Sequence, residues 1–343
     1  FIKLYLRQSI KMNMRYLTAI CLSAAVSFGA VSTAKAQGES DPGLSQLGAM
    51  RSGAATIVTE DEYESNKVQF SVSNTFARGE KDVKYNIPQA EIIAPIASDA
   101  TMGYFHIRIP FVSASGELGN KWGLGDLGVS YTHFLMADPE NWTIQATAGL
   151  QFGMTTANLS DTRSRPLPMS YQSSMGSTEA LAGVNFSWKE YLSIAAGYQQ
   201  AIIRYNQNDY TGLSYFNDPI YSSSDYTVGR KLYRYGDAMM RVEGHLTGNR
   251  AGFTAGALGF YHVHDDLYMD PFYGWQYIKD SHGFSMNLTG NAFIRFGRYG
   301  SCKLDVSGAI PLITRAVRPD GTQRQWVIMP RFTYYFGQHT LLF

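Results

Sequence analysis

The sequence predicts an all-β chain in which about twelve antiparallel strands close into a transmembrane barrel, behind a signal peptide and a short N-terminal segment. Three observations support this. Apolar and polar residues alternate over runs of ten or more residues. Beyond residue 36, no apolar run approaches the ~18 residues that indicate a membrane-spanning helix. The 343 residues include 23 Tyr, 19 Phe and 33 Gly, a composition typical of transmembrane β-barrels.

Residues 1–36 have the pattern of upstream sequence followed by a secretory signal peptide. After an expected start near Met12, Arg15 supplies the positive charge, 17–31 is apolar, and Ala34-Lys35-Ala36 offers the small residues of a cleavage site. We therefore expect the exported chain to begin at Gln37. The alternative is an uncleaved anchor, which the length of the apolar run disfavours because a spanning helix needs ~20 residues.

Charge and cysteine content exclude two classes of protein. The chain has 29 Lys and Arg against 28 Asp and Glu, and five of the basic residues but none of the acidic ones precede Gln37. The remaining 24 basic and 28 acidic residues give a formal charge of −4. Proteins that bind nucleic acid usually carry an excess of positive charge, so this class is disfavoured. Only Cys302 follows the signal region, so a scaffold stapled by internal disulfides is excluded.

Twelve segments have the period-two pattern of strands with one apolar and one polar face. In one of them Phe70 and Val72 alternate with Ser71 and Ser73. Such runs match the ~9–11 residues of a tilted membrane strand. Their number is even, as in bacterial single-chain barrels. The expected spans are 67–78, 83–96, 103–112, 124–135, 141–155, 178–188, 191–203, 230–246, 251–262, 283–297, 302–311 and 323–336.

The predicted connections alternate between short turns and long links, apart from the first link at 79–82. The long links are expected at 113–123, 156–177, 204–229, 263–282 and 312–322. Outer-membrane barrels segregate short periplasmic turns from long external loops, whereas a soluble β-sandwich has no such segregation. We therefore expect the outer membrane of a Gram-negative bacterium, with its lipid and its barrel-assembly machinery as partners. The terminal Phe343 agrees with delivery to that machinery.

One stretch resembles a known family. The run Gly123-Leu124-Gly125-Asp126 with the strand after it, and the run 167–177, resemble barrels named for the meta pathway of phenol degradation, the MetA-like family. That family is similar to the long-chain fatty acid transporters. The resemblance covers about 120–200 and implies passage of small, often hydrophobic compounds. The fatty acid transporters have about fourteen strands, so their gating residues do not carry over.

Residues 37–66 are polar and precede the first strand. By the same resemblance, Leu44 to Thr59 would fold into the lumen as a hatch. The alternative is a mobile periplasmic tail. The sequence therefore divides into 1–36, the segment 37–66 and the barrel 67–343.

Polar side chains on inward strand phases are the candidate lining of the pathway. Within 230–246, Leu232, Met240, Val242 and Leu246 mark the outward phase, so the polar residues on the opposite phase, from Tyr233 to His245, face the lumen. Asp237, Arg241 and Glu243 would form a polar constriction, or else part of a salt-bridged plug. The full candidate set is Arg108, Asp126, Tyr233, Tyr235, Asp237, Arg241, Glu243, His245, Arg295 and Arg331.

The run His262-Val263-His264-Asp265-Asp266 could suggest a metal site, because histidines two apart share a strand face. It lies where a strand enters a long loop, so we interpret these residues as solvated and expect neither metal nor cofactor. No local motif marks an activated nucleophile, so we expect no enzyme. Two functions remain: a channel or facilitator for passive passage of small molecules, hydrophobic ones among them, and a structural or adhesive barrel whose tyrosine-rich external loops bind partners.

Overall fold

The computed structural model describes residues 68–97, 102–138, 141–189, 191–215, 226–248, 250–297, 300–322 and 324–336. The signal peptide, the segment 37–66 and Phe343 lie outside these described residues. The sequence-based expectations about them therefore stay predictions.

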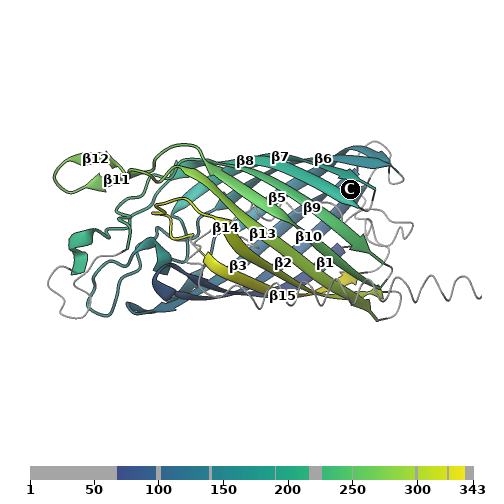
Figure 1. The fold of residues 1–343 in the computed structure, drawn as a ribbon. Coiled ribbons are helices and arrows are strands. Elements are labelled where there is room, and N and C mark those ends of the chain that lie inside the picture. Colours follow the sequence, from purple (N-terminus) through teal and green to yellow (C-terminus); the bar gives the residue numbers. More distant parts are fainter. Residues whose placement is uncertain are drawn as a thin grey trace, which may run out of the picture. The chain divides into compact units, whose positions relative to one another are not determined.

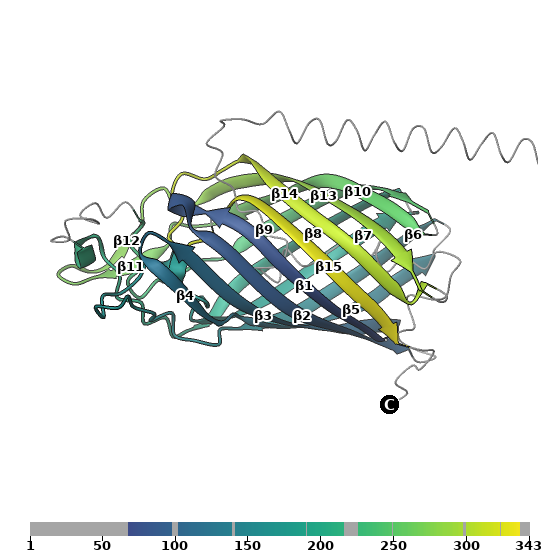
Figure 2. The ribbon, with the colours of Figure 1, turned by 90° about the horizontal axis from the view of Figure 1, so that it is seen from below.

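Twelve strands form one closed antiparallel barrel, which confirms the predicted fold class. Each strand pairs with its neighbour along the chain, and β15 returns to β1, where Phe336 lies opposite Val68. Figures 1 and 2 show the tilted strands winding around this barrel. Its strands are β1 (Val68–Gly79), β2 (Lys84–Ala97), β3 (Met102–Gly116), β5 (Leu127–Asp138), β6 (Trp142–Phe152), β7 (Ser177–Trp188), β8 (Leu192–Arg204), β9 (Asp237–Thr247), β10 (Ala251–His262), β13 (Gly283–Phe296), β14 (Cys302–Ile313) and β15 (Arg324–Phe336).

A further strand, β4 (Gly119–Leu124), corrects the predicted long link at 113–123. The first part of β3 pairs with β5, whereas its last part pairs with β4. β4 and β5 therefore continue one another along β3, with a break at Gly125 and Asp126. The backbone N–H of Gly125 donates to the carbonyl of Pro110 at 2.9 Å. This long hairpin was missed because the turn-forming glycines Gly116 and Gly119 lie in the middle of the presumed loop.

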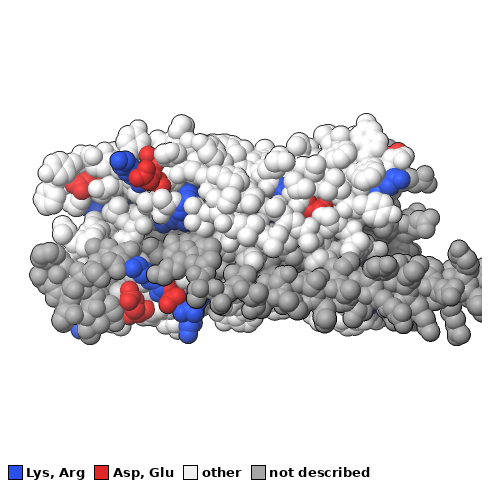
Figure 3. All heavy atoms as spheres, in the orientation of Figure 1, with Lys and Arg blue, Asp and Glu red and all other residues white. Residues whose placement is uncertain are grey.

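The alternation of side chains is that of a membrane barrel, with polar residues inside. In β1, Gln69 and Ser71 are buried, whereas Phe70 and Val72 are exposed. The same pattern recurs around the barrel, and each of its twelve strands exposes at least one large apolar or aromatic side chain. On the face seen in Figure 3, most charged side chains lie toward the two ends of the molecule. The outer surface thus matches a lipid environment.

The strand predicted at 230–246 begins seven residues later than expected, at Asp237. Residues 230–236 belong to the loop before it. The N–H of Tyr235 donates to the carboxylate of Asp266 at 2.8 Å, and Tyr233 forms an isolated bridge with Leu267. These contacts to the next long loop replace the strand pairing that the local alternation predicted.

The predicted link at 263–282 contains a small hairpin, β11 (Leu267–Asp270) with β12 (Gly274–Tyr277), which stands off the barrel at its long-loop end in Figure 1. Short 3-10 turns are η2 (Glu80–Asp82), η3 (Met169–Tyr171) and η4 (Gly212–Tyr215). In the described part of the chain, no helix is long and apolar enough to cross a membrane.

The exposed apolar belt generates a stability prediction at Val306, whose side chain lies halfway along β14 and is exposed. We expect Val306→Arg to destabilise the barrel in lipid vesicles by about 2–4 kcal/mol, the cost of arginine on the lipid face near the bilayer midplane. Urea unfolding in vesicles measures this. Val306→Leu is the control and should change stability little; an equally stable Val306→Arg variant would contradict the assignment of this face to lipid.

Candidate functional site

The loop after β6, residues 153–176, folds inward at the end of the barrel that also carries the long loop 263–282, which we call the long-loop end. Leu167, Tyr171 and Ser173 within it are buried. The Tyr85 hydroxyl on β2 donates to the Ser170 carbonyl at 2.8 Å, and the N–H of Leu118 donates to the Tyr171 hydroxyl at 3.2 Å. The loop is therefore attached to β2 and to the turn between β3 and β4 rather than extended into solvent.

Two amide side chains satisfy the buried backbone of this loop. Gln172 accepts a hydrogen bond from the Leu159 N–H and donates to the Leu159 and Leu167 carbonyls. Asn208, from the loop after β8, donates to the Ala157 and Leu167 carbonyls. Because buried backbone groups without partners are costly, these two side chains let an irregular segment lie inside the barrel.

The loop before β15 packs against the inward loop. An added Cβ at Gly321, which has φ +67°, would lie 2.5 Å from the Ser170 backbone nitrogen. Arg324 donates to the Gly321 carbonyl at 2.8 Å, and its guanidinium lies 3.7 Å from the centre of the Tyr85 ring. Gly321 is thus the residue that permits close approach of the two loops.

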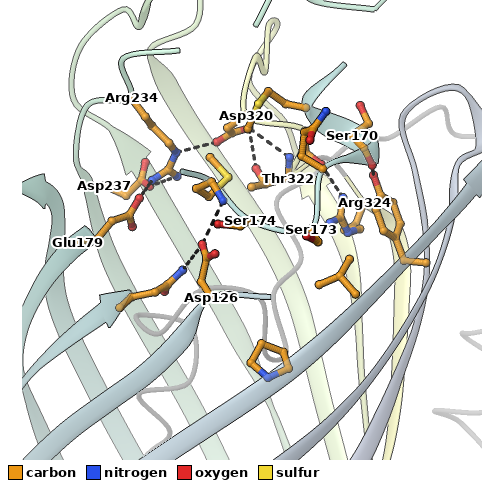
Figure 4. Close-up of a pocket in the computed structure, with 18 of the residues that line it drawn as sticks. Asp126, Ser170, Ser173, Ser174, Glu179, Arg234, Asp237, Asp320, Thr322 and Arg324 are labelled. Atoms are coloured by element: carbon orange, nitrogen blue, oxygen red, sulfur yellow. Dashed lines mark hydrogen bonds and ion pairs between the residues drawn. The ribbon is translucent and has the colours of Figure 1, made fainter. Parts of the chain in front are cut away.

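A cavity of about 100 Å³ lies between these loops and the barrel wall. Figure 4 shows charged and hydroxyl side chains converging on it. The cavity is smaller than the engineered cavity of roughly 150 Å³ that holds one benzene, so a small polar head group and part of an attached apolar body fit within it. Its polar lining includes Asp126, Ser173, Ser174, Glu179, Arg234, Asp237, Asp320, Thr322 and Arg324, and its apolar lining includes Tyr85, Pro110, Val112, Met169 and Phe260.

Arg234 is the cation that joins the acidic residues of the cavity. Its guanidinium lies 2.9 Å from Asp320 and 3.9 Å from Glu179, and it also pairs with Asp237. Burial by itself raises the pKa of Asp320, but the positive charges of Arg315 and Arg234 outweigh burial and hold that pKa well below its ordinary value. These charges are therefore a paired, buried group rather than surface ions.

The inward position of Arg234 corrects the sequence interpretation. Strand phase through 230–246 places Arg234 on the lipid-facing side with Leu232 and Met240. Because the chain is irregular until Asp237, that phase does not apply, and the side chain is 11% exposed. Tyr233 and Tyr235 likewise lie in the loop, half-buried; Arg204 stacks 3.7 Å from the Tyr233 ring centre.

His262 corrects the expectation that the histidine–aspartate run is solvated. His262 and Asp266 are fully buried, and the imidazole lies 2.6 Å from Asp237 and 2.9 Å from Asp266. His282 pairs with Asp265 in the exposed part of the same loop. Among the residues that the structure describes, no three or more His, Cys, Asp or Glu side chains are grouped as a metal site.

Of the predicted lining residues, only Asp126 and Asp237 border this cavity. Further along β9, Arg241 and Glu243 are buried and 3.9 Å apart. His245 lies 2.8 Å from the Ser193 hydroxyl and 3.0 Å from that of Thr254. The structure therefore separates Asp237, at the start of β9, from the paired Arg241 and Glu243.

The other predicted lining residues lie on different strands. Arg331 pairs with Glu91 at 3.3 Å and with Asp305 at 3.1 Å. Arg108 is fully buried, and Arg295 is half-buried over the ring of Phe293. These side chains lie on the inward faces that strand phase predicted for them.

Sequence reasoning missed Glu179, Arg234, Asp320 and Arg324. Glu179 is the one acidic residue in β7, so a carboxylate in a membrane strand was a usable signal for an inward site. The others lie in or beside loops, where no periodicity indicates direction.

Comparison with known proteins shows the fold. The COG4313 outer membrane channel from Pseudomonas putida F1 is similar, with a TM-score of 0.58, 13% identity, and coverage of 81% of this chain and 100% of that one. The NanC porin (TM-score 0.41, 11% identity, 78% and 99% covered) and the outer membrane protein OprD from Pseudomonas aeruginosa (0.32, 8%, 80% and 94%) are more distant. No protein-family model and no curated sequence matches.

The contact between the two loops predicts a large effect of Gly321→Ala. A left-handed residue with a Cβ costs roughly 1–2 kcal/mol, and overpacking adds typically 1–3 kcal/mol. We therefore expect the loop 153–176 to loosen and trypsin to cleave faster after the exposed Arg163. Gly274→Ala is the matched control: its φ is +75°, but nothing lies within 4 Å of an added Cβ. Equal cleavage rates in the two variants would contradict the packing argument.

The pairing of Arg234 predicts a second stability effect. We expect Arg234→Gln to cost about 3–5 kcal/mol in unfolding free energy, because it leaves the buried Glu179 without its cation and removes one of the two positively charged partners of Asp237 and of Asp320. Arg230→Gln is the control, since the ion-pair partner of Arg230 is the exposed Asp209 and such pairs contribute about 0–1 kcal/mol. Urea unfolding of both variants at neutral pH measures the difference; similar losses would show that the buried pairs contribute little.

Proposed function

We propose that the protein is an outer-membrane channel for passive passage of small molecules, hydrophobic ones among them. The inward loop 153–176 carries this proposal. It narrows the long-loop end of the barrel and leaves a small cavity with both charged and apolar walls. Such a constriction selects solutes by size and chemistry without an energy source.

The size of the barrel supports a narrow pathway. Interiors of eight-stranded barrels are filled by side chains, whereas barrels of sixteen or more strands enclose a water-filled channel. Twelve strands lie between these limits, so an inward loop is enough to narrow the lumen to molecular size. The likeness in fold to the Pseudomonas putida channel agrees with outer-membrane localisation.

The two stretches that resemble the phenol-degradation barrels approach each other closely at Gly123. An added Cβ there would lie 2.6 Å from the Ser173 hydroxyl. The two stretches that carry the resemblance, Gly123 to Asp126 and 167–177, thus meet at the wall of the cavity. This supports membership of that family as a proposal.

The remaining lining residues extend the proposed pathway. Arg241, Glu243, Arg108, Arg295 and Arg331 lie on inward faces of their strands, and we propose that they line the lumen beyond the cavity. Asp237, Arg241 and Glu243 stay our proposal for the charged part of the pathway. The segment 37–66 is proposed as a hatch or a periplasmic tail, and no catalytic role is proposed for any residue.

An adhesive barrel is the second candidate function, favoured by the β11–β12 hairpin. Its tip exposes Phe272 and Tyr273, whose exposed fractions are 81% and 80%. Exposed aromatic residues suit contacts with partners outside the cell. This function does not require an open lumen.

Single-channel conductance in planar bilayers tests the proposal. We expect discrete conductance steps from the wild type and larger steps when 157–172 is replaced by a short Gly/Ser linker, because the constriction is removed. A milder variant, Tyr171→Phe, loses the hydrogen bonds of this hydroxyl with the Leu118 N–H and the Tyr226 hydroxyl and should increase current noise.

The control shortens the hairpin tip at 270–274, which stands off the barrel and should leave conductance unchanged. Silent bilayers from folded wild-type and linker proteins would overturn the channel proposal and favour the adhesive barrel.

A further inference from the structure

Asp126 is a buried carboxylate, and one of its two oxygens has no hydrogen-bond partner among the described residues. It lies at the break between β4 and β5, is 7% exposed and borders the cavity. Its Oδ2 accepts hydrogen bonds from the Gln151 amide and the Met175 N–H, both at 3.2 Å. Within the described part of the chain, its Oδ1 accepts no hydrogen bond. The Ser173 hydroxyl, which also borders the cavity, has no hydrogen-bond partner there either.

Asp126 differs from the other acidic residues of the cavity. Glu179, Asp237 and Asp320 are all reached by the guanidinium of Arg234. Among the described residues, Asp126 forms no such ion pair, and its partners are all neutral: the Gln151 amide, the Met175 N–H and the Ser174 side chain. The lining contains four carboxylates and the guanidinium groups of Arg234 and Arg324, and two of the carboxylates have a further partner: Arg315 lies 3.0 Å from Asp320, and His262 lies 2.6 Å from Asp237. Asp126 is therefore the carboxylate of this lining that no ion pair between described residues reaches.

An uncompensated buried carboxylate is a strong binding group for a positively charged donor. Buried polar groups in folded proteins are normally hydrogen-bonded, and exceptions indicate an unmet partner. A carboxylate accepts hydrogen bonds only, so the missing partner must be a donor. Ser173 can accept a second hydrogen bond from the same donor. Asp126, Ser173 and Ser174 all line the cavity, and Figure 4 shows Ser174 next to Asp126.

The rest of the cavity wall defines the other end of the ligand. Pro110, Val112, Met169 and Phe260 supply apolar surface beside Asp126. We propose that Asp126 is the selectivity-determining residue of the channel and binds small organic cations, an ammonium group next to a compact apolar body. The ammonium donates to Asp126 Oδ1 and the Ser173 hydroxyl, and organic anions are excluded by the same charge. This assignment of a substrate class rests on the proposed function as a channel.

Binding to the purified full-length protein is the first test. Benzylammonium, benzyl alcohol and benzoate share one ring and differ in charge, so calorimetry with each separates charge from shape. We expect benzylammonium to bind tightest and Asp126→Asn to weaken it about tenfold or more, since hydrogen bonds to charged groups exceed neutral ones by about this factor. The asparagine keeps the size and an acceptor for the Met175 N–H.

The matched control is Asp209→Asn, which removes the same charge from an exposed position at the same end of the barrel. It should leave benzylammonium binding unchanged. Equal binding of the cation and the alcohol, or equal weakening in both variants, would overturn the assignment of Asp126.

Ion selectivity in bilayers is the second test. We expect the reversal potential in a salt gradient to indicate preference for cations, and Asp126→Asn to shift it toward zero while Asp209→Asn does not. A conducting channel with the same reversal potential in all three proteins would overturn the selectivity role but keep the channel. Silent bilayers with Asp126-dependent benzylammonium binding would overturn the channel and keep the site.

Discussion

The burial of Arg234 among Glu179, Asp237 and Asp320 is the interaction on which the long-loop end depends. Each acidic residue comes from a different part of the chain: β7, the start of β9 and the loop before β15. A single guanidinium therefore joins two strands and a distant loop. Removing it would leave the buried Glu179 without its ion-pair partner, which is far costlier than losing an exposed ion pair.

Around this group, the loops obey the same constraint as the strands. Inside a barrel, backbone donors and acceptors must find partners within the protein. The strands meet this demand by closing β15 on β1. The inward loop meets it with Gln172 and Asn208, whose amides take the place of neighbouring strands. Asp126 stands apart, because the break between β4 and β5 leaves one of its oxygens facing the cavity.

These features connect architecture to the proposed selectivity. The lumen of a twelve-stranded barrel is small, so one inward loop, held by the ion pairs of Arg234, is sufficient to narrow the proposed pathway. The proposed channel is then selective through side chains that are held in place by buried pairs. The ion pairs around Arg234 hold the loops in place, and the proposed preference for cations comes from Asp126.

The sequence by itself determined the barrel, because a lipid-facing surface and a polar interior impose a period of two that local composition records. All twelve strands were predicted, and Arg108, Arg241 and Arg331 lie on their predicted inward faces. The candidate site was predicted only at Asp126 and Asp237. Arg234 was not among the candidates, because the alternation before Asp237 is that of a strand whose phase would turn this side chain outward, whereas contacts to Asp266 and Leu267 hold the segment as a loop. His262 was assigned to solvent, because nothing in the run around it indicates that Asp237, on β9, lies against its ring. Only the tertiary structure decided which loop folds inward, since that depends on attachments such as Tyr85 to Ser170, between residues far apart in the chain.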